Sequence, residues 1–300
     1  MNRFFSKKFG FRFQIIVFLF ISIKQNTCLA QNVISKVYYE FEHVDDRNQP
    51  ENPHREDLVV YLTEEATIQK NVTTLAIREA VNDFIFNPNR QVNSNGAAVL
   101  NLPIIQKDIS KYEYYHNFKN RQSFLFSHLF DTYYVIEDAF PDLAWELLDG
   151  TKKIGGFDCQ LAKSNFGGRL YYAWFTTEIP YPYGPWKLLG LPGLILEAYD
   201  DNNEVSWKFN KFELVDSQNE ERIISPKDGI ITTKEKFEKT FNSVKKNPIA
   251  ARKAAVSSAK ASGSFGLKLD NSIITEYAVG HQKIEGFKEK VLNNPIEIGK

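Results

Sequence analysis

The chain has 300 residues with 37 basic and 37 acidic side chains, so its formal net charge at pH 7 is zero. This balance excludes a protein that binds nucleic acid through a strongly basic overall charge. Only two cysteines are present, Cys28 and Cys159. A disulfide-rich scaffold is therefore excluded, and a hydrophobic core must hold the fold, for which the chain is long enough.

The first thirty residues have the three-part pattern of a cleavable export signal. Four basic residues precede an apolar run of eleven residues at 13–23, and the small side chain of Ala30 follows. As a helix this run measures about 16 Å, roughly half of a bilayer core. We therefore expect cleavage near Ala30 and export to the periplasm or the outer membrane. An uncleaved anchor and a lipoprotein attached through Cys28 are the alternatives.

Cleavage would change the composition of the mature chain. The signal holds five basic residues and no acidic one, which leaves 32 basic against 37 acidic residues and a net charge of −5. Cys159 would be the remaining cysteine, which rules out an intrachain disulfide. No later apolar run is long enough for a membrane span. We expect no nucleic-acid partner and no span after cleavage.

The N-terminal part of the mature chain alternates between extended segments and polar loops. Residues 33–41 and 57–67 are rich in β-branched and aromatic side chains and predict strands, separated by a Pro-rich loop at 45–54. Apolar residues near helical spacing predict a helix over 72–86. Aromatic and β-branched residues return at 118–136 and predict two further strands.

Two hairpins are predicted in the centre of the chain. Strands at 157–165 and 169–176 flank a Gly-Gly pair, and strands at 194–199 and 204–209 flank the polar turn Asp-Asp-Asn-Asn. Alternation of apolar and polar residues in the last strand predicts one buried face and one solvated face. The alternation breaks at 211–212, which predicts a bulge or the end of the strand.

The C-terminal part is typical of helices with a basic surface. Phe237, Phe241 and Val244 follow i, i+4, i+7 spacing and predict a helix that starts near Thr233. An Ala-rich second helix is predicted at 250–261. Six basic residues and no acidic one lie between 240 and 269. This run could contact anionic lipid or an acidic partner, but a solvated helix face is the simpler interpretation. We expect the last residues to be weakly ordered or to form a peripheral tail.

These elements predict a mainly β fold of the α+β class, with a curved antiparallel sheet or half-barrel and a few helices. We assign the signal peptide to residues 1–30, an antiparallel β domain to 31–225, and a helical, basic C-terminal extension to 226–300. The length of the chain suits one large domain with such an extension.

The usual signatures of catalytic and metal sites are absent from the sequence. There is no His-Glu-x-x-His pair, no Gly-x-Ser-x-Gly elbow and no phosphate-binding loop. Cys159 lies in the middle of a predicted strand, which favours a buried structural thiol over a nucleophile. Oxygen and nitrogen ligands gather around one polar loop, namely His43, Asp45, Asp46, His54 and Glu56. Their spacing matches no known ligand geometry, so we predict no metal and no cofactor.

Residues 179–193 are the most unusual stretch of the sequence. Four prolines and three glycines stand among aromatic and aliphatic side chains. Pro fixes φ and Gly permits positive φ, so this segment can hold a rigid, non-repetitive path. We expect it to lie against the sheet, with Trp186, Leu188, Leu189 and Leu191 as anchors. It is either a structural crossover that plugs the core or a preformed apolar shelf for a ligand or partner.

This part of the chain resembles the GLPGLI family. The string Gly190-Leu-Pro-Gly-Leu-Ile195 gives that family its name, and Gly168-Arg169, Ala173-Trp174-Phe175 and Gly184-Pro185-Trp186 fit its surroundings. The resemblance covers about residues 145–200. It implies an exported protein of Bacteroidetes-type bacteria and no particular chemistry. Some relatives are associated with TonB-dependent outer-membrane receptors, and the hairpins look similar to the open sheets of periplasmic lipoprotein carriers.

We therefore expect a non-catalytic binding or accessory protein of the cell envelope, for an apolar ligand, a peptide or an outer-membrane partner. The candidate binding or structural residues are Arg169, Trp174, Gly184, Pro185, Trp186, Gly190, Leu191, Pro192 and Gly193. The alternative is an envelope hydrolase whose site is assembled from distant loops. Its candidate residues are Arg169, Glu178, Asp158 and His128.

Overall fold

The computed structural model describes residues 31–87, 89, 91–92, 94, 109–129, 132–216, 222–223, 229–247, 250 and 293–298. The predicted signal at 1–30 and most of the predicted Ala-rich helix at 250–261 lie outside the described residues, as does most of the basic run that ends near 269.

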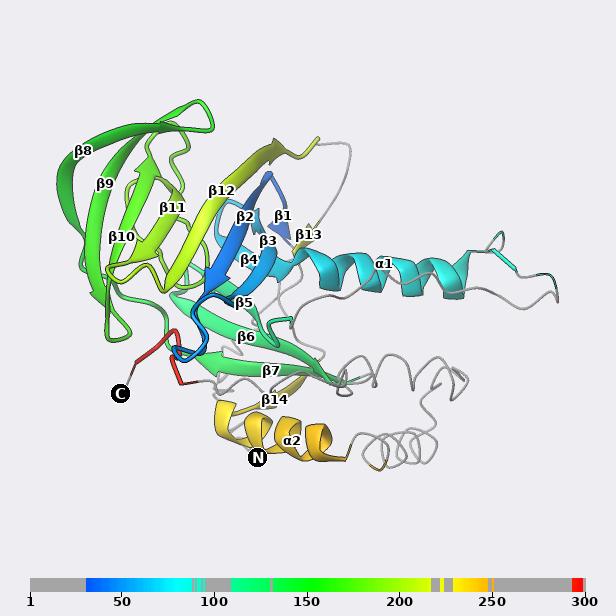
Figure 1. The fold of residues 1–300 in the computed structure, drawn as a ribbon. Coiled ribbons are helices and arrows are strands. Elements are labelled where there is room, and N and C mark those ends of the chain that lie inside the picture. The colour runs from blue at the N-terminus through cyan, green and yellow to red at the C-terminus, as the bar shows by residue number, and fades with distance from the viewer. Residues whose placement is uncertain are drawn as a thin grey trace, which may run out of the picture.

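The described chain forms an open sheet of twelve strands, which Figure 1 shows as a ribbon. The strands are β2 (Ser35–His43), β3 (His54–Leu62), β4 (Ala66–Asn71), β5 (Glu113–Asn117), β6 (Gln122–Leu129), β7 (Thr132–Asp138), β8 (Glu146–Ile154), β9 (Phe157–Phe166), β10 (Arg169–Thr176), β11 (Leu194–Asp200), β12 (Val205–Leu214) and β14 (Ile230–Thr232). Their order is β14-β7-β6-β5-β4-β3-β2-β12-β11-β10-β9-β8, and β14 pairs parallel with β7. The predicted mainly β fold is confirmed.

Two meanders make up this sheet apart from β14. Strands β2 to β7 follow one another along the chain, as do β8 to β12, and the β12–β2 pair joins the two sets. In Figure 1 the β8–β12 meander curves along the left of the molecule, while β5–β7 cross below it. A separate short sheet pairs β1 (Gln31–Asn32) with β13 (Arg222–Ile223).

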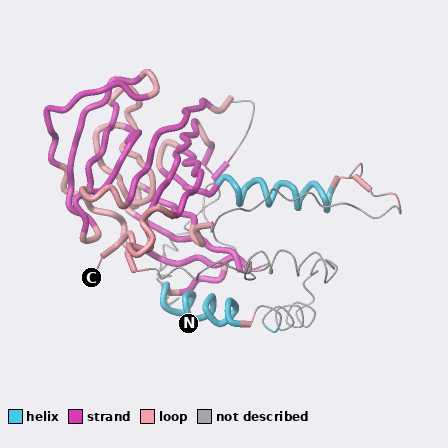
Figure 2. The backbone as a smooth tube through the Cα atoms, in the orientation of Figure 1, coloured by secondary structure: helices cyan, strands magenta, loops and turns pink. Residues whose placement is uncertain are grey.

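In the described part of the chain, two α-helices accompany the sheet where the sequence predicts them. Helix α1 (Val72–Phe86) follows β4 directly, and the Asn71 side chain caps it by accepting the Thr74 N–H at 3.0 Å. Figure 2 shows that α1 extends away from the sheet. Helix α2 (Lys234–Lys246) starts after the cap Thr233 and buries Phe237 against β7.

Three antiparallel strands of the large sheet, β4, β5 and β8, lack a prediction of their own, as do the short strands β1, β13 and β14. The single strand predicted at 57–67 is in fact two, because a turn follows β3, where the Thr63 hydroxyl accepts the Ala66 N–H at 2.9 Å. Strands β5 and β8 are not predicted, because tyrosine and histidine in β5, and the charged residues in β8, hide the apolar pattern. All three lie in a sheet whose partners supply the hydrogen bonds that a local pattern cannot show.

Besides α2, two parts of the predicted extension at 226–300 contact the sheet. Strand β14 extends it beyond β7, and the side chain of Asn294 is buried with 1% exposure. The expectation of a peripheral tail is therefore wrong for residues 293–298, because their polar groups bond to the β8–β12 meander and to the loop after β2.

Candidate functional site

The segment 179–193 fills the inside of the curved sheet. Trp186, Leu188, Leu189 and Leu191 are each at most 4% exposed. Most of them pack in the main hydrophobic cluster with Tyr39, Tyr171 and Trp207 of the surrounding strands. The segment thus lies against the sheet as predicted. Its own side chains fill the space that an apolar ligand would need under the alternative interpretation.

Hydrogen bonds from distant parts of the chain fix the path of the segment. The Tyr183 hydroxyl donates to the Thr63 carbonyl at 3.2 Å, and the Trp145 indole N–H donates to the Leu189 carbonyl at 2.8 Å. Its two ends also meet, since the Leu194 N–H donates to the Ile179 carbonyl at 3.0 Å. The Pro/Gly path is therefore clamped by both meanders.

Trp186 adopts a left-handed backbone conformation with φ of 56°, which is unfavourable for a residue with a side chain. Its N–H donates to the Gln69 side-chain oxygen at 2.7 Å, and its carbonyl accepts from His116 Nε2 at 2.7 Å. The indole stacks on Trp207 with centroids 5.7 Å apart and 12° between the rings. These contacts offset the strain and join β4, β5 and β12 at one residue.

His116 is held as a neutral imidazole with an assigned tautomer. The Trp186 carbonyl can only accept, so the proton lies on Nε2, and Nδ1 accepts from the Ser123 hydroxyl at 2.7 Å. Complete burial lowers the pKa of His116 to about 4. The ring therefore acts as a structural hydrogen-bond bridge at neutral pH.

Close backbone approaches explain two glycines of the segment 179–193. A Cβ at Gly193 would lie 2.0 Å from the Thr176 carbonyl oxygen, and one at Gly184 would lie 2.3 Å from the Leu188 carbonyl oxygen. Gly190 differs, because its φ of 95° requires glycine although the space around it is open. The path of the segment 179–193 therefore requires glycine at all three positions.

Arg169 is a buried, paired charge at the start of β10. Its side chain is 2% exposed and donates from Nη1 to Asp200 at 2.5 Å and to Glu204 at 3.0 Å. Hydrogen bonds from Arg47 and Arg169 lower the pKa of Glu204 to about 2. Asp200 also accepts the N–H groups of Glu204 and Val205, at 2.7 and 2.9 Å. Arg169 thus fixes the β11–β12 turn.

Most of the predicted site residues serve the core, and three reach the surface. Gly190 and Pro192 are exposed, and Trp174 is partly exposed. The buried ones are Arg169, Gly184, Pro185, Trp186, Leu191 and Gly193. Sequence reasoning missed Lys187, which is 6% exposed and pairs with Asp138 at 2.7 Å and Glu297 at 2.6 Å. A lysine among apolar anchors was the available signal of a buried ion pair.

The four hydrolase candidates have other partners. Glu178 accepts the backbone N–H of Asp158 at 2.7 Å, while the Asp158 carboxylate pairs with Lys153 at 2.7 Å. Arg169 is held by Asp200, and the His128 ring lies 4.5 Å from that of Tyr133, with a pKa lowered to about 4 by burial. None of these described contacts joins two of the four side chains as an acid–base pair.

The polar loop at 45–54 is held by hydrogen bonds. Asp46 accepts from the side chains of Asn48 and Gln49, and His54 contacts Glu56. Within the described ranges, no group of three or more His, Cys, Asp or Glu side chains is arranged to hold a metal ion.

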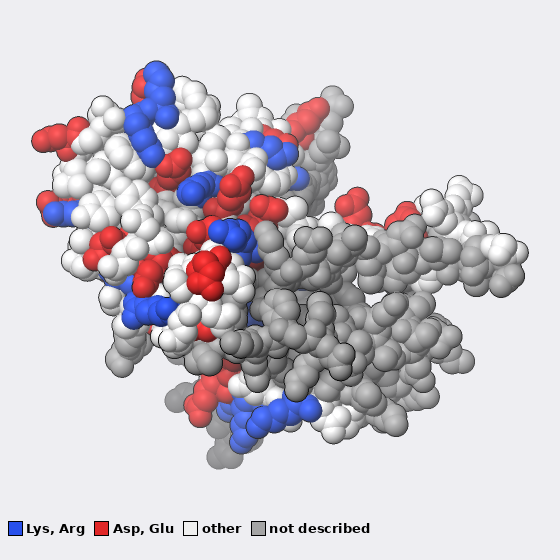
Figure 3. Space-filling model, viewed as in Figure 1, with Lys and Arg blue, Asp and Glu red and all other residues white. Residues whose placement is uncertain are grey.

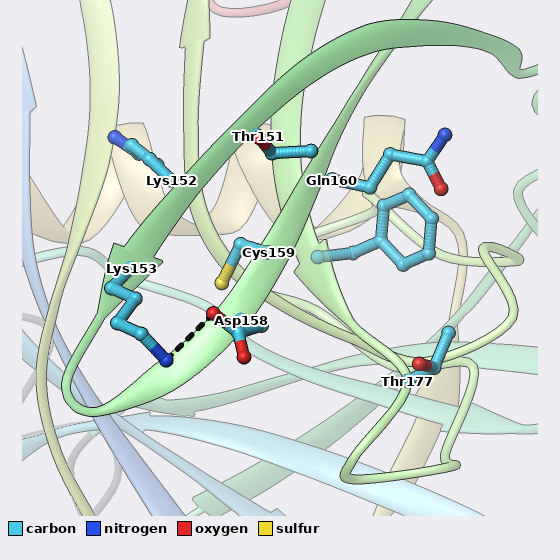
Figure 4. A pocket seen from close by; sticks show the side chains of 8 residues that line it. Thr151, Lys152, Lys153, Asp158, Cys159, Gln160 and Thr177 are labelled. Carbon is cyan, nitrogen blue, oxygen red and sulfur yellow. Dashed lines mark ion pairs between the residues drawn. The ribbon is translucent and has the colours of Figure 1, made fainter.

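A pocket of about 520 Å³ opens at the β8 end of the sheet, and Figure 4 shows its lining. The lining residues are Thr151, Lys152, Lys153, Asp158, Cys159, Gln160, Phe175 and Thr177. Cys159 is buried, as predicted, and burial raises the pKa of its thiol to about 11, so the thiol stays protonated at neutral pH. Reactive-thiol chemistry is therefore disfavoured here.

Trp174 lies beside this pocket on β10. The Lys152 ammonium, which lines the pocket, sits 4.6 Å from the centroid of the Trp174 indole and also contacts Glu197. Figure 3 shows acidic and basic side chains interspersed over the visible surface of the β8–β12 meander. The pocket surroundings therefore combine an aromatic face with nearly balanced charge.

The described helices include none long and apolar enough to cross a bilayer. A family model described as a protein of unknown function (Porph_ging) matches residues 169–197. This stretch holds every predicted binding or structural residue, from Arg169 to Gly193. It overlaps the region that resembles the GLPGLI family, a name that stays a prediction.

No curated protein matches the chain. Two solved structures of PNGF-II, in the P21 and C2 space groups, are similar to it with a TM-score of 0.46 and 13% sequence identity. The similarity covers 69% of this chain and 32% of each of those chains, so the chain spans about a third of their length.

Proposed function

We propose that this chain is an exported, non-catalytic binding protein of the cell envelope that holds an extended peptide segment of an envelope protein beside Trp174. One observation carries the proposal. Trp174 stays partly exposed next to a pocket of about 520 Å³. Trp186, which lies in the same matched stretch 169–197, is buried in the core.

The lining of the pocket favours a peptide over an apolar ligand. Thr151, Gln160 and Thr177 offer hydrogen-bonding groups of the kind that bind main-chain amides, and Phe175 supplies an apolar wall. The interior where an apolar ligand would bind is filled by the segment 179–193. An amphipathic peptide matches a mixed lining better than a lipid chain does.

The position of the pocket supports the same choice. Strand β8 is the last of the described sheet, with β9 on one side and no strand partner on the other among the described residues. Edge strands bind extended segments by strand addition. Trp174, which β9 separates from the edge strand, would then act through Lys152 of β8, whose ammonium lies over its indole.

The cellular setting is part of the proposal. The signal pattern at 1–30 supports export, and the GLPGLI resemblance supports an outer-membrane partner such as a TonB-dependent receptor. N-terminal sequencing of the protein from envelope fractions tests this part, with a mature start near Gln31 expected. A cytoplasmic, uncleaved chain would contradict it.

Site-specific photocrosslinking in the native host tests the binding site. A crosslinker at Thr151 should capture one partner peptide, and Trp174→Ala should lower the yield at least tenfold. Trp174→Phe keeps an aromatic ring and should retain most of it. A crosslinker at the exposed Lys208 of β12 is the matched control. Equal yields from Thr151 and Lys208, or a Trp174→Ala loss explained by unfolding, would refute the site.

A further inference from the structure

Residues 293–298, Asn-Asn-Pro-Ile-Glu-Ile, lie on the β8–β12 meander in the manner of a bound peptide. Figure 1 shows them in red beside the blue loop that follows β2. Asn294 is 1% exposed, whereas Asn293, Pro295 and Ile298 are exposed. The segment is therefore held mainly through polar contacts around one buried side chain.

The side chain of Asn294 is fully bonded. Its oxygen accepts from Arg169 Nη2 at 2.5 Å, and its nitrogen donates to the Val44 carbonyl at 2.6 Å and to Glu204 at 3.0 Å. An aspartate would lose both donors and place a second carboxylate beside Glu204. The site therefore discriminates between Asn and Asp.

Arg169 and the Gly167-Gly168 turn also form hydrogen bonds with the main chain of the segment. Arg169 donates from Nε to the Ile296 carbonyl at 3.1 Å and from Nη2 to the Pro295 carbonyl at 2.9 Å. The Ile298 N–H donates to the Gly167 carbonyl at 2.6 Å. These are main-chain bonds of the kind that peptide-binding grooves make.

Two further features shape the site around the segment. Lys187 pairs with Glu297 at 2.6 Å, which selects an acidic residue at this position. A Cβ at Gly168 would lie 2.1 Å from the Ile298 carbonyl oxygen, so only glycine admits the segment there. The buried ion pair with Asp200 holds the Arg169 side chain in place without any contact from the segment.

We propose that the loop after β2, the Gly167-Gly168 turn, Arg169 and Lys187 form a recognition site for peptides of the type Asn-Pro-apolar-Glu, and that residues 294–297 are its resident occupant. A matching peptide in trans binds the same site when the resident segment is weakened. An empty site would leave Arg169 donors unpaired in a buried place, which favours occupancy. This surface is distinct from the Trp174 pocket, and the proposal does not depend on that pocket.

Fluorescence anisotropy with a labelled peptide of sequence 291–300 tests the proposal on full-length chains. The peptide should bind Asn294→Ala at least tenfold more tightly than the wild-type chain, whose site is already filled. A peptide with Asp in place of the buried Asn should bind that variant at least tenfold more weakly. The matched control Asn210→Ala removes an exposed asparagine of β12 that bonds to Glu40 and not to the segment, so this variant should bind the peptide as weakly as the wild type.

Asn294→Asp is a second way to weaken the resident segment and should also bind the unmodified peptide. The proposal is overturned if folded Asn294→Ala and Asn294→Asp both fail to bind it, or if the Asn and Asp peptides bind equally. Failure of both variants to fold would overturn it as well, because the segment would then belong to the fold itself.

Discussion

The buried His116 should make the fold sensitive to acid between pH 6.5 and 4. Its pKa is lowered to about 4 by burial, against about 6.5 in an unfolded chain. The unfolded chain therefore binds a proton that the folded chain excludes in this window. Stability from His116 is fully present above pH 6.5 and is lost as the pH falls toward 4. The difference amounts to about 2 kcal/mol between pH 7 and pH 4.5.

Urea unfolding of the wild type and of His116→Gln at pH 7 and pH 4.5 measures this contribution. His43 and His128 have pKa values lowered in the same direction and affect both proteins alike, so the difference between the two pH responses isolates His116. The variant does not titrate at this position, and its amide can still donate toward Trp186. Its free energy of unfolding should fall by about 2 kcal/mol less than that of the wild type. Equal falls would refute the burial argument.

Two comparisons by thermal or urea unfolding test the backbone strain and the close contacts described for the segment 179–193. Trp186→Ala should lower the free energy of unfolding by about 3–5 kcal/mol. Trp186→Gly should be no less stable than Trp186→Ala, because glycine relieves the left-handed strain. A glycine variant clearly less stable than the alanine variant would contradict this. Gly193→Ala should cost more than about 3 kcal/mol through its backbone clash, whereas Gly190→Ala should cost about 1–2 kcal/mol from strain alone. Equal effects at the two glycines would show that the clash is relieved by a shift of the chain.

Local patterns in the sequence were enough to predict the central hairpins. The alternation of Val205, Trp207 and Phe209 set the buried face of β12, and the break after Phe209 is a register shift against β2. The apolar spacing over 72–86 matches the bounds of α1. These features depend on neighbours within a few residues, so one sequence contains them.

Long-range pairing was beyond the sequence. Gln69 looks like an ordinary polar residue, yet it is buried because it accepts the Trp186 N–H, 117 residues away along the chain. The burial of the Pro/Gly segment could be predicted from its composition, but not that Lys187 would have two carboxylate partners. The role of Asn294 had no local signal at all, since its partners come from three separate loops and strands.

The seam between β2 and β12 has a consequence for the order in which the fold is made. Each meander can assemble from strands that are neighbours along the chain, but the seam joins distant residues, as the hydrogen bond from Asn210 to Glu40 across 170 positions shows. Pairing across so long a loop is slow to nucleate. On the proposed export route the chain crosses a membrane from its N-terminus. One edge of β2 therefore stays unpaired until β12 has also crossed the membrane. We expect this interval, rather than the finished sheet, to be the time when the protein is most open to aggregation and to chaperones.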